Sequence, residues 1–372
     1  MRARTATGEQ HFWNVASTVW WVLCASLAFS ARAQDLGTST PPLDRIRLPS
    51  DGSGLLTTEG AAVVPHLAHS VAFALDYGHN PVVIRDAATG EVAGALVAHR
   101  VGGAFAATVG LLGRMSLGFE LPLVMFQGAG ALEGFGTAPL VTSGLAPLGI
   151  GDLRLVPKIQ VLRQRRHFVN VAFLPVVIFP TATGLTLLPS TALRFGGDFL
   201  GERKDAFSLQ PGLAISWDSS VVRTVGMLSY RLRPPLPVST PAGPIDLDPE
   251  LIFRAGFGAW AHELERALVP RPEKGSRLPP ALAFLEVSGA ISDRAFLSGR
   301  GDASSLTTTQ RNIVQTSLEW HAGLRFEPPG SPWQITTALG GGLLRGLGTP
   351  DLRVVLQLRW QVPESSEAPP PA

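Results

Sequence analysis

Three polar side chains of types found in acyl-transfer sites, Ser317, Glu319 and His321, alternate along one short stretch. A hydroxyl, a carboxylate and an imidazole can act as nucleophile, orienting group and base when they meet within hydrogen-bonding distance. On one face of an extended strand, however, successive side chains lie about 6.6–6.8 Å apart. Nothing nearby indicates oxyanion-hole donors. We therefore predict no catalytic residues and no enzymatic activity.

Histidines and glycines offer two further kinds of chemistry. His66, His69, His79 and His99 are close in sequence but lack the HExxH or His-x-His spacing of metal sites. The glycines at 340–342 fall within an alternating stretch and not at the start of a helix, where a phosphate loop would require them. We expect surface and interior histidines, a glycine-rich strand, no metal and no cofactor.

The elements that hold these residues show a regular alternation of apolar and polar side chains, clearest at residues 351–362. One face of this stretch is apolar, and it is formed by Leu352, Val354, Leu356, Leu358, Trp360 and Val362. The opposite face is partly charged, and it is formed by Arg353, Val355, Gln357, Arg359 and Gln361. A period of two with these unlike faces indicates a β-strand between two different solvents. We interpret it as the closing strand of a barrel, paired with the strand around residues 71–77.

The same pattern recurs from about residue 69 onward, in stretches of about ten residues or more. It predicts an all-β protein, a transmembrane antiparallel up-and-down β-barrel of about 12 strands, with 14 as the alternative. Short connections at 112–113, 163–167, 218–220 and 327–332 alternate with longer loops, as expected for a barrel with short periplasmic turns. Residues 262–280 are an exception, because they form a long connection on the short-turn side.

Composition separates a membrane barrel from a soluble sandwich. Hydrophobic residues make up 45% of the chain, charged residues 16%, and the mean hydropathy is +0.21. After residue 33, no apolar run reaches the roughly 18 residues that a spanning helix needs. The stretches exceed the usual soluble strand of about five or six residues, and a dry core would not accept so many unpaired charges. A soluble periplasmic β-sandwich that binds a ligand remains the alternative.

Charged and polar side chains of the second face are predicted to line the lumen: Arg100, Glu120, Arg154, Lys158, Arg223, Arg231, Arg254, Glu286, Glu319, His321, Arg325, Arg353 and Arg359. Rings of one charge set ion selectivity, so a pore with a mild anion preference is one interpretation. The other is an interior closed by ion pairs, as in many small barrels. Both remain open from the sequence.

Aromatic residues at strand ends on the apolar face indicate contact with the two membrane interfaces. The residues of this predicted girdle are Tyr77, Trp217, Tyr230, Trp320, Trp333 and Trp360.

The N-terminus has the pattern of a secretory signal peptide covering residues 1–33. Arg2 and Arg4 precede an apolar run at 18–30, and Ala31-Arg32-Ala33 forms an A-x-A cleavage pattern. The only cysteine, Cys24, lies within it, so the mature chain is expected to hold no disulfide or reactive thiol.

The remaining boundaries follow from composition. Residues 34–65 are a predicted periplasmic lead-in or plug-like segment, 66–362 the outer-membrane barrel and 363–372 a proline-rich tail. A net charge of +2 does not favour nucleic-acid binding. The expected partners are outer-membrane lipid, the barrel-assembly machinery during biogenesis and small solutes.

Three stretches carry a family resemblance: GDLRLVPKIQVL at 151–162, the span 199–234, and LGTPDLRVVLQLRW at 347–360. They resemble the large-barrel OmpA-type outer-membrane proteins of myxobacteria, and the likeness covers most of residues 60–362. The first stretch is also similar to transporter barrels of the phenol-degradation (MetA-pathway) type. In the OmpA-type family a proline-rich linker and a peptidoglycan-binding domain follow the barrel, and residues 363–372 look like the start of such a linker.

The resemblance implies an envelope structural protein or a passive channel for small solutes. The transporter-like stretch implies the alternative, an outer-membrane transporter of small hydrophobic molecules.

Overall fold

The computed structural model describes residues 46–85, 92–128, 148–185, 207–233, 236–240, 243–247, 249–268, 279–292, 316–344, 346 and 348–361. The predicted signal peptide at 1–33, the first part of the predicted lead-in and the tail at 363–372 lie outside these ranges.

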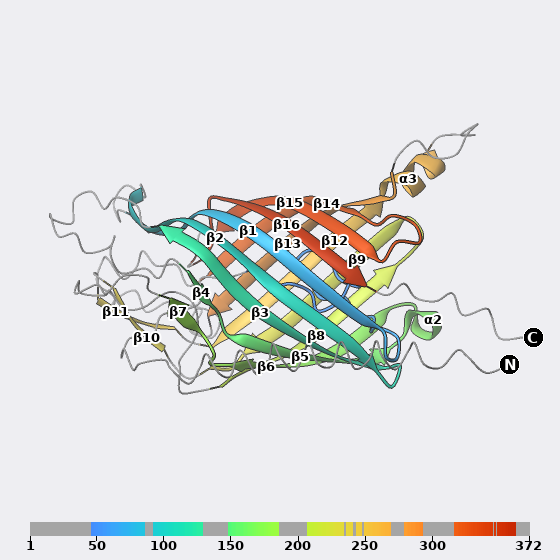
Figure 1. The fold of residues 1–372 in the computed structure, drawn as a ribbon, viewed down its shortest axis with the longest axis horizontal. Helices are drawn as coiled ribbons and strands as arrows, with labels where there is room; N and C mark the ends of the chain where they lie inside the picture. The colour runs from blue at the N-terminus through green and yellow to red at the C-terminus, as the bar shows by residue number, and fades with distance from the viewer. Residues whose placement is uncertain are drawn as a thin grey trace, which may run out of the picture.

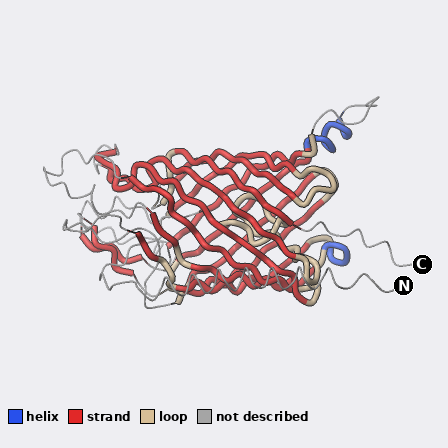
Figure 2. The backbone as a smooth tube through the Cα atoms, viewed as in Figure 1, coloured by secondary structure: helices blue, strands red, loops and turns tan. Residues whose placement is uncertain are grey.

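Twelve antiparallel strands form the wall of a closed barrel, tilted against its long axis (Figures 1 and 2). They are β1 (His69–Arg85), β2 (Val92–Leu111), β3 (Met115–Gly128), β5 (Leu153–Leu162), β6 (Asn170–Phe179), β8 (Ser208–Asp218), β9 (Val222–Arg231), β12 (Glu250–Trp260), β13 (Ala281–Ser292), β14 (Ser317–Phe326), β15 (Trp333–Leu344) and β16 (Leu352–Gln361).

The barrel closes where the last strand meets the first. β16 pairs with β1 over the whole stretch from Ser70↔Gln361 to His79↔Leu352. Closure leaves no free edge in the twelve-strand wall, which a β-structure in hydrocarbon requires. The predicted pairing of the closing strand is confirmed, the count of twelve is confirmed, and the β-sandwich alternative is wrong.

Short helices and strands lie at the two ends of the barrel. At the end with short turns lie α2 (Gln164–His167) and α3 (Ala261–Leu268), so the long connection predicted at 262–280 begins with a helix. At the other end lie β4 (Leu148–Ile150), β7 (Thr183–Leu185) and the hairpin of β10 (Leu236–Thr240) with β11 (Gly243–Leu247). Among the described residues, no helix is long and apolar enough to cross a membrane.

Alternation along each strand gives the barrel two unlike surfaces. On β16, Arg353, Val355, Gln357 and Arg359 are buried, whereas the alternate residues face outward. The outer surface is apolar along strand after strand, as in the exposed side chains Phe73, Phe173, Leu213, Leu285, Leu324 and Leu356. An apolar belt of this extent suits lipid, because soluble monomers rarely expose so much contiguous apolar surface.

The six predicted girdle residues are all at least partly exposed on this outer face. Trp217, Trp333 and Trp360 lie near the short turns, and Trp333 is directly opposite Trp360 in the register. Tyr230 and Trp320 lie toward the opposite end of their strands, and Tyr77, in the middle of the longer β1, is opposite Val354 near the start of β16. The two groups therefore lie toward opposite rims of the barrel, as interfacial aromatic belts do.

One part of the wall is interrupted between β5 and β6. The register runs from Leu153↔Phe179 to Leu155↔Val177 and resumes at Ile159↔Phe173, so Pro157 lies opposite Pro175. Gln160 donates its N–H toward β3, to the carbonyl of Arg114. Because backbone N–H groups alternate in direction along a strand, those of the odd-numbered residues of β5 point toward β6. Both prolines lack the N–H that this position would use, which explains the three-residue break.

Candidate functional site: the inner segment and the lumen

Residues 46–66, called the inner segment below, run inside the barrel and form neither helix nor strand (Figures 1 and 2). Most of them are buried. The segment's backbone is bound by inward side chains from widely separated strands, which places it within the lumen and not across a rim. It therefore occupies part of the lumen.

Arg325 on β14 binds backbone carbonyl groups of the inner segment within residues 52–55. Its Nη1 donates to the carbonyl oxygens of Gly52 at 3.2 Å and Gly54 at 2.8 Å, and its Nη2 donates to that of Leu55 at 2.6 Å. One guanidinium thus satisfies three buried carbonyls. Hydrogen bonds to charged groups contribute about 1.5–3 kcal/mol each, so this contact is among the strongest that hold the segment.

Glu286 on β13 binds the backbone N–H groups that follow, at residues 56–58. Its carboxylate accepts the N–H groups of Leu56 at 2.9 Å, Thr57 at 3.0 Å and Thr58 at 2.7 Å. Successive N–H groups turned to one side form a small anion-binding concavity. Arg254 on β12 completes the arrangement by donating to the carbonyl of Thr57 at 2.6 Å.

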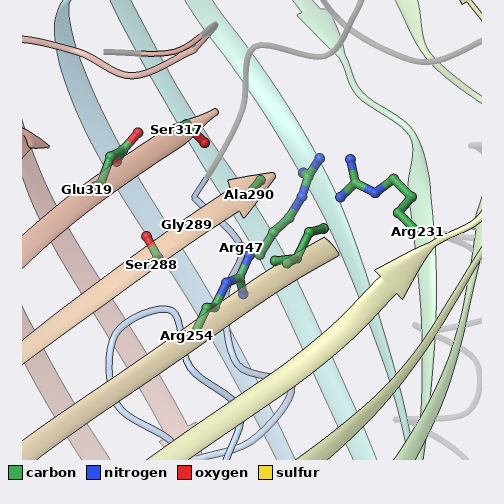
Figure 3. Close-up of a pocket in the computed structure, with 9 residues that line it drawn as sticks. Arg47, Arg231, Arg254, Ser288, Gly289, Ala290, Ser317 and Glu319 are labelled. Carbon is green, nitrogen blue, oxygen red and sulfur yellow. The ribbon is translucent and has the colours of Figure 1, made fainter. Parts of the chain in front are cut away.

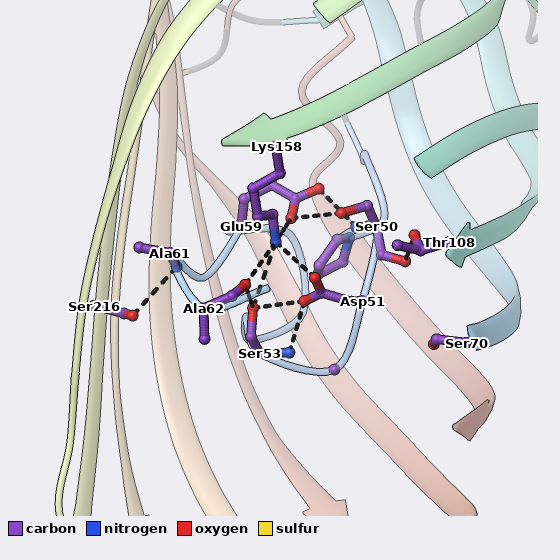
Figure 4. A network of polar contacts seen from close by, with 12 residues as sticks. Ser50, Asp51, Ser53, Glu59, Ala61, Ala62, Ser70, Thr108, Lys158 and Ser216 are labelled. Carbon is purple, nitrogen blue, oxygen red and sulfur yellow. Dashed lines mark hydrogen bonds and ion pairs between the residues drawn. The ribbon is translucent and has the colours of Figure 1, made fainter. Parts of the chain in front are cut away.

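A third contact joins Lys158 on β5 to two acidic residues of the inner segment (Figure 4). The Lys158 Nζ lies 2.9 Å from a carboxylate oxygen of Asp51 and 2.9 Å from one of Glu59. Burial opposes ionisation of Asp51, but the Lys158 ammonium and two hydrogen bonds from Ser53 outweigh it, so the pKa of Asp51 lies below its usual value of 3.8. A buried lysine is compatible with a folded barrel because two carboxylates flank it.

The remaining contacts hold the start of the inner segment on the other side of the lumen. Arg359 on β16 donates to the carbonyls of Pro49 at 2.7 Å and Ser50 at 3.3 Å. The Thr108 hydroxyl on β2 also donates to Ser50, and Glu120 on β3 accepts the N–H of Leu48 at 2.9 Å. Strands from around the whole barrel therefore bind one peptide segment.

Charged side chains of the lumen also pair with one another. Arg353 lies 3.0 Å from Asp76 and 3.3 Å from Glu319, and Arg154 forms an ion pair with Glu120. At the end with the longer loops, Glu250 lies 3.0 Å from Arg233. Ion pairs therefore cross the interior, and peptide groups of the inner segment are further partners of the lumen charges.

Apolar groups fill the space that the charges leave. Leu55 and Leu56 pack with Leu282 and Phe284 of β13. On the opposite wall, Ala61 packs against a wholly apolar patch formed by Val156, Ala172, Leu174, Val176, Ile178 and Ala214. The inner segment is therefore bound by polar contacts from many strands, and van der Waals contacts are added by the apolar patch around Ala61.

The predicted lumen-lining residues lie on the inner face. Twelve are buried, and Arg223 is partly exposed near the short turns, where it pairs with Asp218 at 2.6 Å. The Glu319 and His321 side chains lie 3.5 Å apart. Both Glu319 oxygens lie within 3.4 Å of Arg353, so this carboxylate serves a structural ion pair.

The predicted histidine group divides between the two rims. His79 and His99 have ring centroids 5.2 Å apart, and His99 also contacts the Tyr77 hydroxyl at 2.8 Å. Within the described ranges, no group of three or more His, Cys, Asp or Glu residues could hold a metal ion.

Sequence reasoning missed the partners of the lumen charges. Asp51 and Glu59 were not predicted as lumen residues, and no backbone group of the inner segment was assigned a contact. One signal was present, because the predicted inward cations outnumber the predicted inward carboxylates, and the surplus needs other acceptors such as peptide carbonyls. The glycines of the segment were a second signal: a Cβ on Gly54 would lie 2.0 Å from the Thr58 carbonyl oxygen.

Comparison with known proteins concerns the fold. No protein-family model and no curated protein matches the chain. Among solved structures, an outer membrane channel from Pseudomonas putida F1 matches with a TM-score of 0.50 and 11% identity, covering 81% of this chain and 98% of that one. The NanC porin matches with a TM-score of 0.41 and 8% identity, covering 79% and 100% of the two chains. The CymD monoaromatic hydrocarbon channel matches with a TM-score of 0.36 and 9% identity, covering 80% and 88%.

The first of these matches shows that the chain has the architecture of an outer-membrane β-barrel.

Proposed function

We propose that this protein is an outer-membrane channel for small solutes whose lumen is held closed by the inner segment. The observation that carries the proposal is the binding of one peptide segment by Arg325, Glu286, Lys158 and Arg359 from four different strands. These contacts are polar and involve a segment without regular structure, so they can break without disturbing the wall. Passage through the barrel requires the segment to move.

A reversible cross-link tests this role of the segment. The Ala61 N–H lies 3.2 Å from the Ser216 hydroxyl of β8, so A61C and S216C place two thiols within reach of each other. The mature chain is predicted to contain no other cysteine, which keeps the oxidation specific. In planar bilayers we expect the oxidised double variant to conduct no ions and the reduced form to conduct as the wild type does. The S216C single variant controls for the substitution on β8.

Deletion of residues 34–60 provides the opposite test. It removes most of the inner segment and its polar contacts, so conductance should rise above that of the wild type. A barrel that conducts neither with nor without the segment would overturn the channel and favour an envelope structural protein. If the oxidised A61C/S216C protein conducts like the reduced protein, the segment is not the gate.

A second function, transport of small hydrophobic molecules, is favoured by one observation. The inner face of β6 carries no charged side chain, and it joins the apolar patch against Ala61. Uptake of a hydrophobic dye into cells that express the wild type or the 34–60 deletion separates the two functions. Uptake of the dye without uptake of a small hydrophilic antibiotic supports the hydrophobic transporter.

We also propose outer-membrane localisation after cleavage behind Ala33, absence of enzymatic activity, and membership of the myxobacterial OmpA-type group. The fold supports the localisation, the engagement of Glu319 by Arg353 argues against catalysis on β14, and the stretches at 151–162 and 347–360 support the group. Membrane fractionation with N-terminal sequencing tests the first proposal: a mature protein beginning at Gln34 in the outer membrane supports it, and a detergent-free soluble protein contradicts it.

A further inference from the structure

Two small cavities lie in the lumen beside the start of the inner segment, and Arg47 and Arg254 line both. The first cavity is polar, with Arg231, Ser288, Ser317 and Glu319 among its lining residues (Figure 3). The second is amphipathic, with arginines on one wall and aliphatic side chains on the other. Each cavity has room for about one water-sized group in the closed state.

The polar wall of the second cavity is positively charged. Arg154 and Arg254 line it together with Arg47, and Arg154 keeps its ion pair with Glu120. The lining carboxylate, Glu59, is already 2.9 Å from Lys158. The Nε–H groups of Arg154 and Arg254 are buried, and neither has a hydrogen-bond acceptor within the part of the chain that the structure describes. Buried guanidinium groups usually find such acceptors, and a carboxylate offers two oxygens in a matching geometry.

The apolar wall of the same cavity is formed by Val156, Leu174, Val176 and Met227. All four side chains are buried, and three of them belong to the apolar patch of β5 and β6. A pocket with apolar walls and a few convergent polar groups is the usual form of a small-molecule site. The two walls together select a molecule with an anionic end and an apolar body.

The break in the β5–β6 ladder gives this wall room to move. Val156 and Val176 lie within the three unpaired positions around Pro157 and Pro175. Local opening is easiest where backbone hydrogen bonds are missing. The cavity can therefore enlarge on the side of its apolar wall while the ladders on other sides of the barrel stay intact.

We propose that this cavity is a binding site for small carboxylates with an apolar body. The carboxylate binds to Arg154 and Arg254, and the body packs against Val156, Leu174 and Val176. The inference rests on the proposed function, because it names the class of solute that the channel would recognise. It does not require that the channel be open.

Ligand binding to the full-length mature protein in detergent tests the site without any substitution. Benzoate is the probe, acetate supplies the same anion without the body, and benzyl alcohol supplies the body without the charge. We expect saturable benzoate binding by calorimetry, with acetate and benzyl alcohol each bound at least about ten-fold more weakly. Absence of saturable benzoate binding, or equal affinity for benzoate and either control compound, would overturn the proposal.

A pair of variants then assigns the binding to the cavity. R254Q removes a cationic lining group together with one bond to the inner segment, at Thr57. R359Q also loosens the segment, at Pro49 and Ser50, but Arg359 lines neither cavity. We expect benzoate affinity to fall about ten-fold or more in R254Q and to stay within about two-fold in R359Q. Equal losses in both would mean that the segment, and not the cavity, decides affinity, and would contradict the site.

V176T provides a second test of the site, which remains available if an arginine variant misfolds. It nearly preserves the volume of Val176 but puts a hydroxyl on the apolar wall, so benzoate should bind about three-fold or more weakly while acetate binding stays the same. Benzoate binding is measured at equilibrium and does not depend on ion flow. A protein that binds benzoate without conducting rejects only the channel, and one that conducts without binding benzoate rejects only the site. The two proposals can therefore be rejected separately.

Discussion

β6 and β14 are both ten residues long and lie in the same barrel, yet they present opposite surfaces to the lumen. The buried side chains of β6 include Ala172, Leu174, Val176 and Ile178, whereas those of β14 include Glu319, His321 and Arg325. The ladder between β6 and β5 is interrupted, whereas the pairing of β14 with β13 is continuous over its described length.

The two sides of the lumen wall therefore contact the inner segment in different ways. The side that carries β13, β14 and β16 binds the backbone of the inner segment through charged groups, and the continuous pairing of β13 with β14 keeps Glu286 and Arg325 in place. The side that carries β5 and β6 packs an apolar patch against Ala61, adds one charged contact through Lys158, and has a weak point in its ladder. The contrast predicts that substitutions on the first side release the segment, while substitutions on the second change the wall.

The largest effect is expected from R325A. The substitution removes the charged donor of the Gly54 and Leu55 carbonyls, at a cost of about 1–3 kcal/mol each, and leaves the Gly52 carbonyl only its 3.4 Å contact with Arg223. Amide hydrogen exchange within residues 52–58 should accelerate about a hundred-fold or more, because the segment leaves its site more often. Mass spectrometry of peptides from the inner segment measures this change.

L174A on β6 is the matched control for that prediction. Truncation of this buried leucine should lower the stability of the barrel by about 2–5 kcal/mol, measured by the temperature at which the folded band disappears from an unheated gel. It should not accelerate exchange in the inner segment selectively. If L174A releases the segment as strongly as R325A, the division between the two walls is wrong.

E286Q should give a smaller release. The amide keeps one acceptor oxygen near the N–H groups of Leu56, Thr57 and Thr58 but removes the charge, and charge-assisted hydrogen bonds are about twice as strong as neutral ones. We expect a loss of about 1–2 kcal/mol, visible as about ten-fold faster exchange at these amides. E263Q on α3, where Glu263 pairs with Arg266 outside the barrel, should leave the exchange unchanged.

The double variant P157V/P175V tests the weak point of the other wall. It restores the two missing N–H donors at directly opposed positions, and each new hydrogen bond should contribute about 0.5–1.5 kcal/mol. We expect slower exchange of the neighbouring amides and a higher unfolding temperature of the barrel. Unchanged exchange around Val156 and Val176 would show that the prolines do not cause the break.

The smallest effect concerns pH. The pKa of Asp51 lies below 3.8 in the folded protein, so its contribution to seating the inner segment is complete above that value and is lost as the pH falls through the lower, folded-state pKa. Conductance should therefore be the same at pH 7 and pH 5 and should rise only below about pH 4. D51N cannot ionise and should abolish that rise; a step between pH 7 and pH 5 would point to a different group.

Much of the fold followed from local sequence. Alternation in stretches such as 351–362 assigned each side chain to the lipid or the lumen, because a strand's side chains point to opposite faces whatever it pairs with. The even count and the pairing of the last strand with the first followed from the need to close the sheet. The inward position of Arg325, Glu286 and Lys158 could be predicted for the same reason.

What these charges bind was decided only by the tertiary structure. The inner segment has no period that predicts its path, and the residues that hold it are remote in sequence: Glu286 is separated from Thr58 by 228 positions and Arg325 from Leu55 by 270. Such contacts leave no local signal, since they depend on how the strands close around the segment. The opposition of Pro157 and Pro175 likewise depends on the register of two strands. The sequence by itself determined that the barrel has a charged interior; the closure of the strands around the inner segment determined that these charges bind that segment.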